Sequence, residues 1–197
     1  LKSKGDGAPI FLARYSARPE WVGKNVFEIA HEQKTEPLDI VLQITRNGGA
    51  SIVNFGMSED DVRHVMSLPW VATASDGRAY IPGSDRPHPR SYGTFPRKIG
   101  HYALQEKVIS LEHALRSATS LPAKIIGLTD RGWIKPDYVA DIVVFDPQQF
   151  IDIATFEKPH QHSQGVVHVF VNGKAAIKDG VPTGLLAGRS VRHVVSE

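Results

Sequence analysis

The sequence of 197 residues contains no cysteine, which excludes a disulfide framework, a thiolate metal site and a cysteine nucleophile. It also lacks an excess of one charge. Its 23 basic and 21 acidic side chains leave a formal charge of +2, too little for a surface that attracts nucleic acid or anionic lipid. No apolar run approaches the roughly 20 residues that span a bilayer, and the start LKSKGDGAPIFLARYS has no long apolar signal segment. We therefore expect a cytoplasmic protein with no nucleic-acid and no membrane partner.

The composition is that of a globular protein, with 41% hydrophobic and 22% charged residues. This length is enough for one ordinary domain or two small ones, each with a buried core. The 17 glycines and 13 prolines indicate many turns and argue against a simple helix bundle.

The first part of the chain alternates between strand and helix patterns. Helix caps are predicted at Asn25, Thr35 and Ser58, the second helix ending at Gly48-Gly49. Apolar strand patterns occupy residues 8–15 (APIFLARY), 50–56 (ASIVNFG) and 70–75 (WVATAS). Strands that alternate with helices in this way predict a parallel sheet covered by the helices.

The middle and the last third have different patterns. Residues 77–97 contain four prolines and predict a long loop, of the kind that is often functional in compact domains. Helices are predicted at about 95–106 and at 111–119, followed by strands at 140–147, 166–171 and 175–178. Asn172-Gly173 is a strong hairpin signal, so a small β unit is expected to begin between residues 128 and 139.

Asp76 is the first candidate for chemistry, because it follows an apolar strand directly in the tripeptide Ser-Asp-Gly. A carboxylate at the carboxyl end of a parallel strand faces the region where such sheets build active sites. There it could bind a cation or act as a general base toward water. The alternative is that Asp76-Gly77 is only a turn in which the aspartate bonds its own backbone.

Two further motifs contain histidine or arginine. His88 and Arg90 lie in the loop sequence RPHPR, where Arg90 could bind a substrate carboxylate in bidentate fashion and His88 could donate a hydrogen bond. The alternative is a proline-stiffened surface loop with solvated charges. His160 and His162 have the spacing of a zinc pair, but no third ligand is close in sequence, and we do not expect metal binding there.

Several longer strings carry a family resemblance: SEDDVRHVMSLPWVATASDG, HPRSYGTFPRKIGHY, SLEHALRSATSLPAKIIGL, DRGWIKPDYVADIVVFDP, TFEKPHQHSQGVVHVFVNG and DGVPTGLLAGR. In this order they resemble the C-terminal part of the D-aminoacylases, the N-acyl-D-amino-acid deacylases of the metal-dependent amidohydrolase superfamily. The resemblance implies an α/β fold, the C-terminal part of a (β/α)₈ barrel followed by strands of a small β-sandwich. Residues 1–127 would then supply the last barrel strands and helices, and residues 128–197 the C-terminal share of the sandwich.

The resemblance also implies a reaction, the hydrolysis of N-acyl-D-amino acids by zinc-activated water. Asp76 would be the family's aspartate at the end of the last barrel strand, acting as general base and at most as a weak metal ligand. Arg90 would bind the substrate's α-carboxylate, with His88 as a second substrate-binding residue. The remaining zinc ligands are not on this chain. The chain alone is therefore expected to be inactive, with the missing N-terminal part of the enzyme or another copy of itself as its partner.

Two other functions stay open at this point. One is a ring-opening amidohydrolase related to dihydroorotases or hydantoinases, since the phrase ADIVVFD marks the superfamily as a whole. The other is a non-catalytic assembly module made from a barrel remnant and a sandwich.

Overall fold

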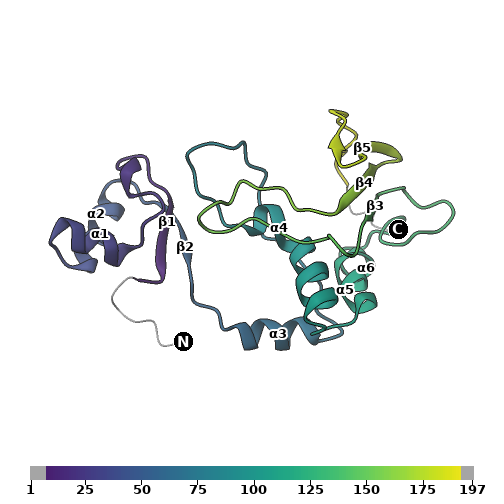
Figure 1. Cartoon of the computed structure of the whole chain (residues 1–197), viewed down its shortest axis with the longest axis horizontal. Helices are drawn as coiled ribbons and strands as arrows, with labels where there is room; N and C mark the ends of the chain where they lie inside the picture. The colour runs from purple at the N-terminus through teal and green to yellow at the C-terminus, as the bar shows by residue number, and fades with distance from the viewer. Residues whose placement is uncertain (1–7, 192–197) are drawn as a thin grey trace, which may run out of the picture. The chain divides into compact units, whose positions relative to one another are not determined.

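The computed structural model describes residues 8–191, which form a mixed α/β fold (Figure 1). They divide into two compact units, each built from separate stretches of chain. Unit 1 comprises residues 8–62, 76–92 and 154–161, and unit 2 comprises residues 63–75, 93–153 and 162–191. The short stretch 154–161 thus lies in the same unit as the N-terminal part of the chain.

Unit 1 contains a two-stranded antiparallel sheet with two helices beside it. Its elements are β1 (Ile10–Arg14), the 3₁₀ helix η1 (Pro19–Trp21), α1 (Val26–Gln33), α2 (Pro37–Arg46) and β2 (Ser51–Asn54). In Figure 1, α1 and α2 lie together next to β1. The core consists of buried side chains from β1, η1 and both helices, namely Leu12, Tyr15, Trp21, Val26, Ile29, Ala30, Ile40 and Ile44.

The start of α1 follows the prediction from sequence. The Asn25 side chain accepts a hydrogen bond from the Glu28 backbone N–H at 2.8 Å, and the Glu28 carboxylate accepts one from the Asn25 N–H at 2.9 Å. This reciprocal pair satisfies two backbone donors that a helix start leaves without partners. The cap of α2 lies one residue later than predicted, at Glu36, and Pro37 occupies the first turn.

Unit 2 combines helices with a four-stranded antiparallel sheet. The helices are α3 (Glu59–Ser67) and α4 (Arg90–Pro96), both of which begin in unit 1, the π-helix η2 (Arg97–Gln105), α5 (Leu111–Ala118) and α6 (Ser120–Ile125). The strands are β3 (Ile142–Phe145), β4 (Val166–Val171), β5 (Lys174–Lys178) and β6 (Val181–Pro182), paired in that order. Buried Ile99, Ala103, Ile109, Ala114 and Phe150 form the core.

The β-rich last third and its hairpin are confirmed. Asn172 and Gly173 both have positive φ, 49° and 74°, as the tight turn between β4 and β5 requires. The predicted cap of α5 is also present, because the Ser110 hydroxyl accepts a hydrogen bond from the His113 N–H at 3.1 Å.

Two expectations about the sheet are wrong. The strand pairs of the described residues are all antiparallel, so the alternation of strands and helices does not produce a parallel sheet within residues 8–191. Residues 70–75 are not a strand. A strand needs a partner strand, and the Thr73 N–H donates instead to the Ser117 carbonyl of α5 at 2.8 Å.

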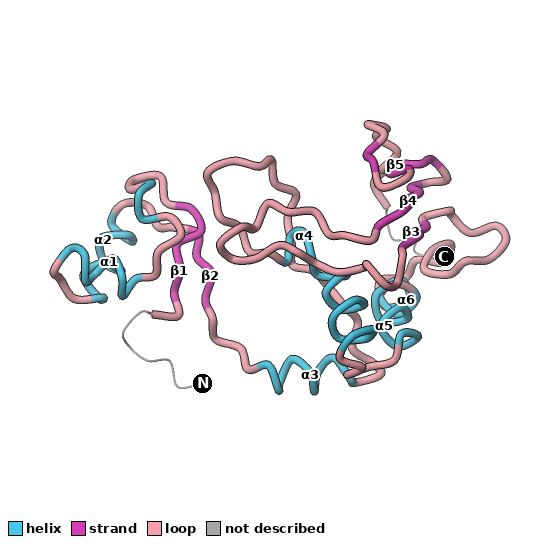
Figure 2. Tube along the Cα trace, viewed as in Figure 1, coloured by secondary structure: helices cyan, strands magenta, loops and turns pink. Residues whose placement is uncertain are grey.

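The predicted loop is shorter than expected, because α4 starts at Arg90 and continues into η2 where one helix was predicted at 95–106. Figure 2 shows the remaining loop before α4, which contains no helix or strand. None of the described helices combines the length and the apolar character that crossing a bilayer demands.

Lys98 on η2 connects residues 70–75 to α5. Its side chain is only 5% exposed, and its Nζ donates to the Thr73 hydroxyl at 2.5 Å and to the Ser117 hydroxyl at 2.7 Å. Burial disfavours the charged ammonium and lowers its pKa from 10.5 to about 8. Lys98 therefore anchors the segment that leads to Asp76 at an electrostatic cost.

The first prediction concerns this cost. Below pH 8 Lys98 is charged in both the folded and the unfolded chain, whereas between pH 8 and 10.5 only the unfolded chain still holds the proton. The free energy of unfolding of the wild type, relative to Lys98→Met, should therefore rise over this window and stay flat below it. One pKa unit corresponds to about 1.4 kcal/mol, so a shift from 10.5 to about 8 limits the rise to about 3.5 kcal/mol. Urea denaturation of both chains across pH 6–10.5 measures it, and a pH-independent difference would contradict it.

Candidate functional site

Asp76 and Arg90 are brought together in unit 1. An oxygen of the Asp76 carboxylate, Oδ2, lies 2.7 Å from Arg90 Nη2. Asp76 has a φ of 46°, a left-handed turn conformation that aspartate tolerates better than most residues. Asp76 lies in a segment without regular structure, and its side chain reaches the loop that carries His88 and Arg90.

This ion pair is open to solvent, because the side chains of Asp76 and Arg90 are 82% and 43% exposed. Pairs this exposed contribute little to folding stability, since water screens the charges and both side chains lose freedom. The pair therefore adds little to the stability of the fold, and both charged groups remain accessible to solvent.

A local hydrogen bond to the backbone of Arg90 orients the His88 ring. Its Nδ1 accepts a hydrogen bond from the Arg90 backbone N–H at 3.0 Å, so a neutral ring carries its proton on Nε2. Burial lowers the pKa of His88, the positive charge of Arg90 lowers it further, and the Asp76 carboxylate opposes both. His88 is accordingly neutral at pH 7 and offers a donor at Nε2.

An aromatic row supports the His88 ring. Phe156 lies edge-on to His88, with ring centroids 4.9 Å apart, and also contacts Phe55 at 4.4 Å. Phe55 in turn contacts Phe11 of β1 at 5.3 Å. The row connects β1, the residues after β2 and the stretch 154–161, and no sequence motif predicted it.

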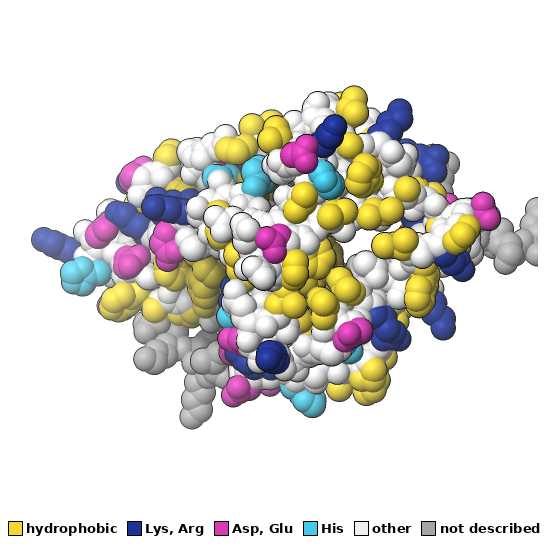
Figure 3. Space-filling model, turned by 45° about the vertical axis from the view of Figure 1, so that its right-hand side comes forward, with side chains coloured by type: hydrophobic (Ala, Val, Ile, Leu, Met, Phe, Trp, Pro, Cys, Tyr) yellow, Lys and Arg dark blue, Asp and Glu magenta, His cyan; other side chains and the backbone are white. Residues whose placement is uncertain are grey.

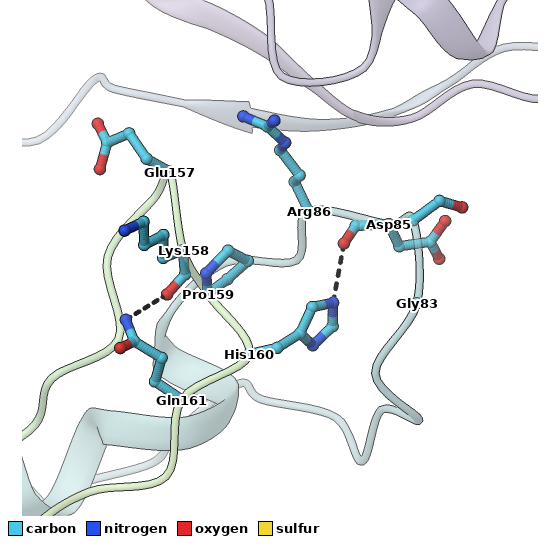
Figure 4. Close-up of a pocket in the computed structure, with 9 residues that line it drawn as sticks. Gly83, Asp85, Arg86, Glu157, Lys158, Pro159, His160 and Gln161 are labelled. Carbon is cyan, nitrogen blue, oxygen red and sulfur yellow. Dashed lines mark hydrogen bonds between the residues drawn. The ribbon is translucent and has the colours of Figure 1, made fainter.

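A pocket of about 330 Å³ lies between residues 83–86 and residues 157–161 of the same unit (Figure 4). The backbone of the first stretch is tied to β1, because the Arg86 N–H donates to the Ala13 carbonyl at 2.9 Å. The Arg86 side chain lies over Gly23, where a Cβ atom would be only 2.6 Å from Arg86 Nη1. Gly23 therefore permits the approach of this loop to the first strand.

The two histidines with zinc-pair spacing do not form a metal site. Both ring nitrogens of His160 have protein partners, the Tyr92 hydroxyl at 2.8 Å and the Asp85 carbonyl at 2.9 Å. Within residues 8–191 no three His, Asp or Glu side chains come together as a metal site would need.

The family model for the amidohydrolase family matches residues 11–177. The chain belongs to the amidohydrolase family. Among curated relatives it is 39% identical over 171 residues to the D-aminoacylase of Alcaligenes xylosoxydans xylosoxydans, covering 87% of this chain and 34% of that protein. To the N-acyl-D-glutamate deacylase of that organism it is 36% identical over 165 residues, covering 84% and 33%. The resemblance found in the sequence is thus confirmed.

Solved structures give the same result. A crystal structure of D-aminoacylase, described as defining a novel subset of amidohydrolases, superposes with a TM-score of 0.83 at 38% identity, over 91% of this chain and 37% of that one. The N-acyl-D-glutamate deacylase of Bordetella bronchiseptica, complexed with zinc and a phosphonate mimic of the tetrahedral intermediate, gives 0.78 at 32% identity, over 92% and 38%. The chain spans about a third of the length of the curated relatives it matches.

The second prediction tests the electrostatics around His88. Arg90→Gln should raise the pKa of His88, because it removes a positive neighbour and leaves Asp76 the stronger influence. Asp76→Asn should lower the pKa of His88, because the Asp76 carboxylate is the one cause of the three that raises this pKa. NMR titration of the His88 Cε1–H in the 197-residue chain measures both, with Arg46→Gln on α2 as the charge-matched control. Shifts in the same direction for the two variants would contradict the assigned causes.

Proposed function

We propose that this chain is the C-terminal part of a zinc-dependent N-acyl-D-amino-acid deacylase. The relatives that it matches act, by their names, on N-acyl-D-amino acids, including N-acyl-D-aspartate and N-acyl-D-glutamate. In the proposed complete enzyme, residues 1–127 form the last part of a (β/α)₈ barrel and residues 128–197 form part of a β-sandwich. The antiparallel sheet β3–β6 is consistent with the second assignment.

The observation that carries the proposal is the contact between Asp76 and Arg90. Hydrolysis of an N-acyl-D-amino acid needs a base for the attacking water and a cation for the substrate's free carboxylate. Asp76 takes a proton from water as its oxygen attacks the acyl carbon, and returns that proton to the amine as the C–N bond breaks. Arg90 binds the α-carboxylate through two parallel N–H···O bonds, whereas the contact described with Asp76 joins one nitrogen, Nη2, to one carboxylate oxygen, Oδ2.

His88 is proposed as a second contact with the substrate. Its neutral ring carries an Nε2–H donor on the same segment as Arg90, and this donor is proposed to meet the substrate carboxylate. A neutral N–H donor can orient the carboxylate through one hydrogen bond and does not add a second positive charge to the site.

Zinc is proposed only for the complete enzyme, where it would polarise the acyl carbonyl and acidify bound water. Asp76 is at most a weak ligand, and the other ligands would come from protein outside this chain. The roles proposed for Asp76, His88 and Arg90 are therefore stated for the chain's own side chains and do not depend on where a metal sits.

Exposed apolar side chains support a larger protein. On the face drawn in Figure 3, hydrophobic side chains are exposed over a broad area. Large apolar residues with high exposure include Met57, Trp70, Ile81, Ile134 and Leu186. Monomeric proteins seldom leave so much apolar surface in water, and such surface usually meets more protein. We propose the missing N-terminal part of the enzyme as that protein, and the cytoplasmic location stays a prediction.

The third prediction concerns the chain alone. Zinc added to the 197-residue polypeptide should give no hydrolysis of N-acetyl-D-amino acids, because the described residues hold no cluster of three metal ligands. Amine release measured with and without zinc tests this, and turnover above the zinc blank would refute it.

The fourth prediction concerns the complete enzyme. Asp76→Asn should lower kcat by about 10²–10⁴-fold with little change in KM, the usual loss when a general base is removed. Arg90→Gln should raise KM by about 10–100-fold, because a hydrogen-bonded charge partner of the substrate is lost.

The control is Arg46→Gln, which removes the same charge from the end of α2. Comparing substrates separates the proposed deacylase from a ring-opening amidohydrolase. The proposal requires that the complete enzyme hydrolyse N-acyl-D-amino acids in preference to cyclic ureides such as dihydroorotate or hydantoins. Preference for the cyclic ureides, or an Asp76→Asn enzyme of normal kcat, would overturn it.

A further inference from the structure

The segment Asp85–Tyr92 carries both proposed substrate-binding residues, yet most of it has no regular structure. It contains Pro87 and Pro89, which remove two backbone donors, and it enters α4 only at Arg90. Contacts from other parts of unit 1 must therefore fix where the side chains of His88 and Arg90 lie.

His160 contacts both ends of this segment. Its Nε2 lies 2.9 Å from the Asp85 carbonyl oxygen, and its Nδ1 lies 2.8 Å from the Tyr92 hydroxyl. Figure 4 shows the ring reaching from the stretch 157–161 to the Asp85 backbone. A carbonyl can only accept, so Nε2 carries a hydrogen, and the neutral ring then accepts the Tyr92 O–H at Nδ1.

The two side chains also meet as a ring pair. The His160 and Tyr92 rings are perpendicular, at 90°, with centroids 5.7 Å apart, an edge-to-face arrangement. His160 thus uses both nitrogens to bridge two residues that are seven positions apart in the chain.

Residues 88–92 form a connected set of contacts. Ser91 N–H donates to the His88 carbonyl at 3.1 Å, Tyr92 N–H donates to the Pro89 carbonyl at 2.9 Å, and Arg90 N–H donates to His88 Nδ1. Fixing Asp85 and Tyr92 therefore fixes the turn between them, and with it the start of the Arg90 side chain.

We infer that His160 is a positioning residue, which clamps both ends of the segment 85–92 and so sets the place of Arg90 and His88. His160 touches neither Asp76 nor Arg90 in the contacts described, so it acts through the segment. Its consequence for the substrate rests on the proposed function, because there Arg90 binds the α-carboxylate.

Four substitutions separate the contact of His160 with Asp85 from its contact with Tyr92. His160→Asn places an amide near the position of Nδ1 and keeps a partner for Tyr92, whereas His160→Gln reaches the position of Nε2 and keeps a donor for Asp85. His160→Ala removes both contacts. Tyr92→Phe removes the Tyr92 hydrogen bond without touching His160. The matched control is His31→Ala, an exposed histidine on α1.

The first measurement needs no activity. In the 197-residue chain, His160→Ala should speed the amide hydrogen exchange of peptides spanning residues 85–92 about tenfold. The exchange rates of His160→Asn, His160→Gln and Tyr92→Phe should lie between those of the wild type and His160→Ala. Peptides covering α1 should not change, and His31→Ala should not affect residues 85–92. Exchange at residues 85–92 that equals the wild type in all the His160 variants would overturn the inference, whatever the reaction is.

The second measurement uses the complete enzyme. His160→Ala should raise KM for an N-acyl-D-amino acid about two- to tenfold, the loss of an ordinary hydrogen bond, and leave kcat less affected. The preference for the free acid over its carboxamide should fall by a similar factor, with partial recovery in His160→Asn or His160→Gln. An unchanged acid preference in an active His160→Ala enzyme would overturn the positioning role. A wild-type enzyme that hydrolyses none of these substrates would refute the proposed function, and the exchange result would then decide on the clamp alone.

Discussion

The loop before α4 has no helix or strand of its own, so its shape depends on groups supplied from elsewhere in unit 1. The Ala13 carbonyl of β1 accepts from the loop backbone, Phe156 supports the His88 ring, and His160 holds the two ends of the last segment. Each of these groups is far from the loop in sequence. The Asp76–Arg90 contact therefore depends on the whole unit being folded, although both residues are exposed.

Much of the local structure could be predicted from sequence because the signals span only a few residues. The Asn25 capping box, the Ser110 cap and the Asn172-Gly173 turn each involve side chains and backbone groups at most three residues apart. The direction of strand pairing could not be predicted in this way, since it depends on which strand lies alongside. Residues 70–75 have an apolar pattern typical of a strand, but their backbone meets α5 instead.

Asp76, His88 and Arg90 could be chosen as candidates from sequence, because they lie in the short motifs Ser-Asp-Gly and RPHPR and because those motifs resemble a known family. Phe156 and the contacts of His160 could not be predicted, because they join residues 68 and 75 positions apart. The His160-x-His162 spacing is that of a zinc pair and gives no indication that His160 contacts Asp85 and Tyr92. Lys98 gave no sequence signal, since its burial between two hydroxyls arises only in the folded chain.

The discontinuous construction of unit 1 has a consequence for its synthesis on the ribosome. Strands β1 and β2 and helices α1 and α2 are complete once residue 54 has emerged, whereas Phe156 and His160 emerge about a hundred residues later. During translation the loop before α4 therefore lacks its contacts with Phe156 and His160 while most of unit 2 is being made. A premature stop codon before position 154 would spare β1, β2, α1 and α2, and would still remove these two contacts from the loop.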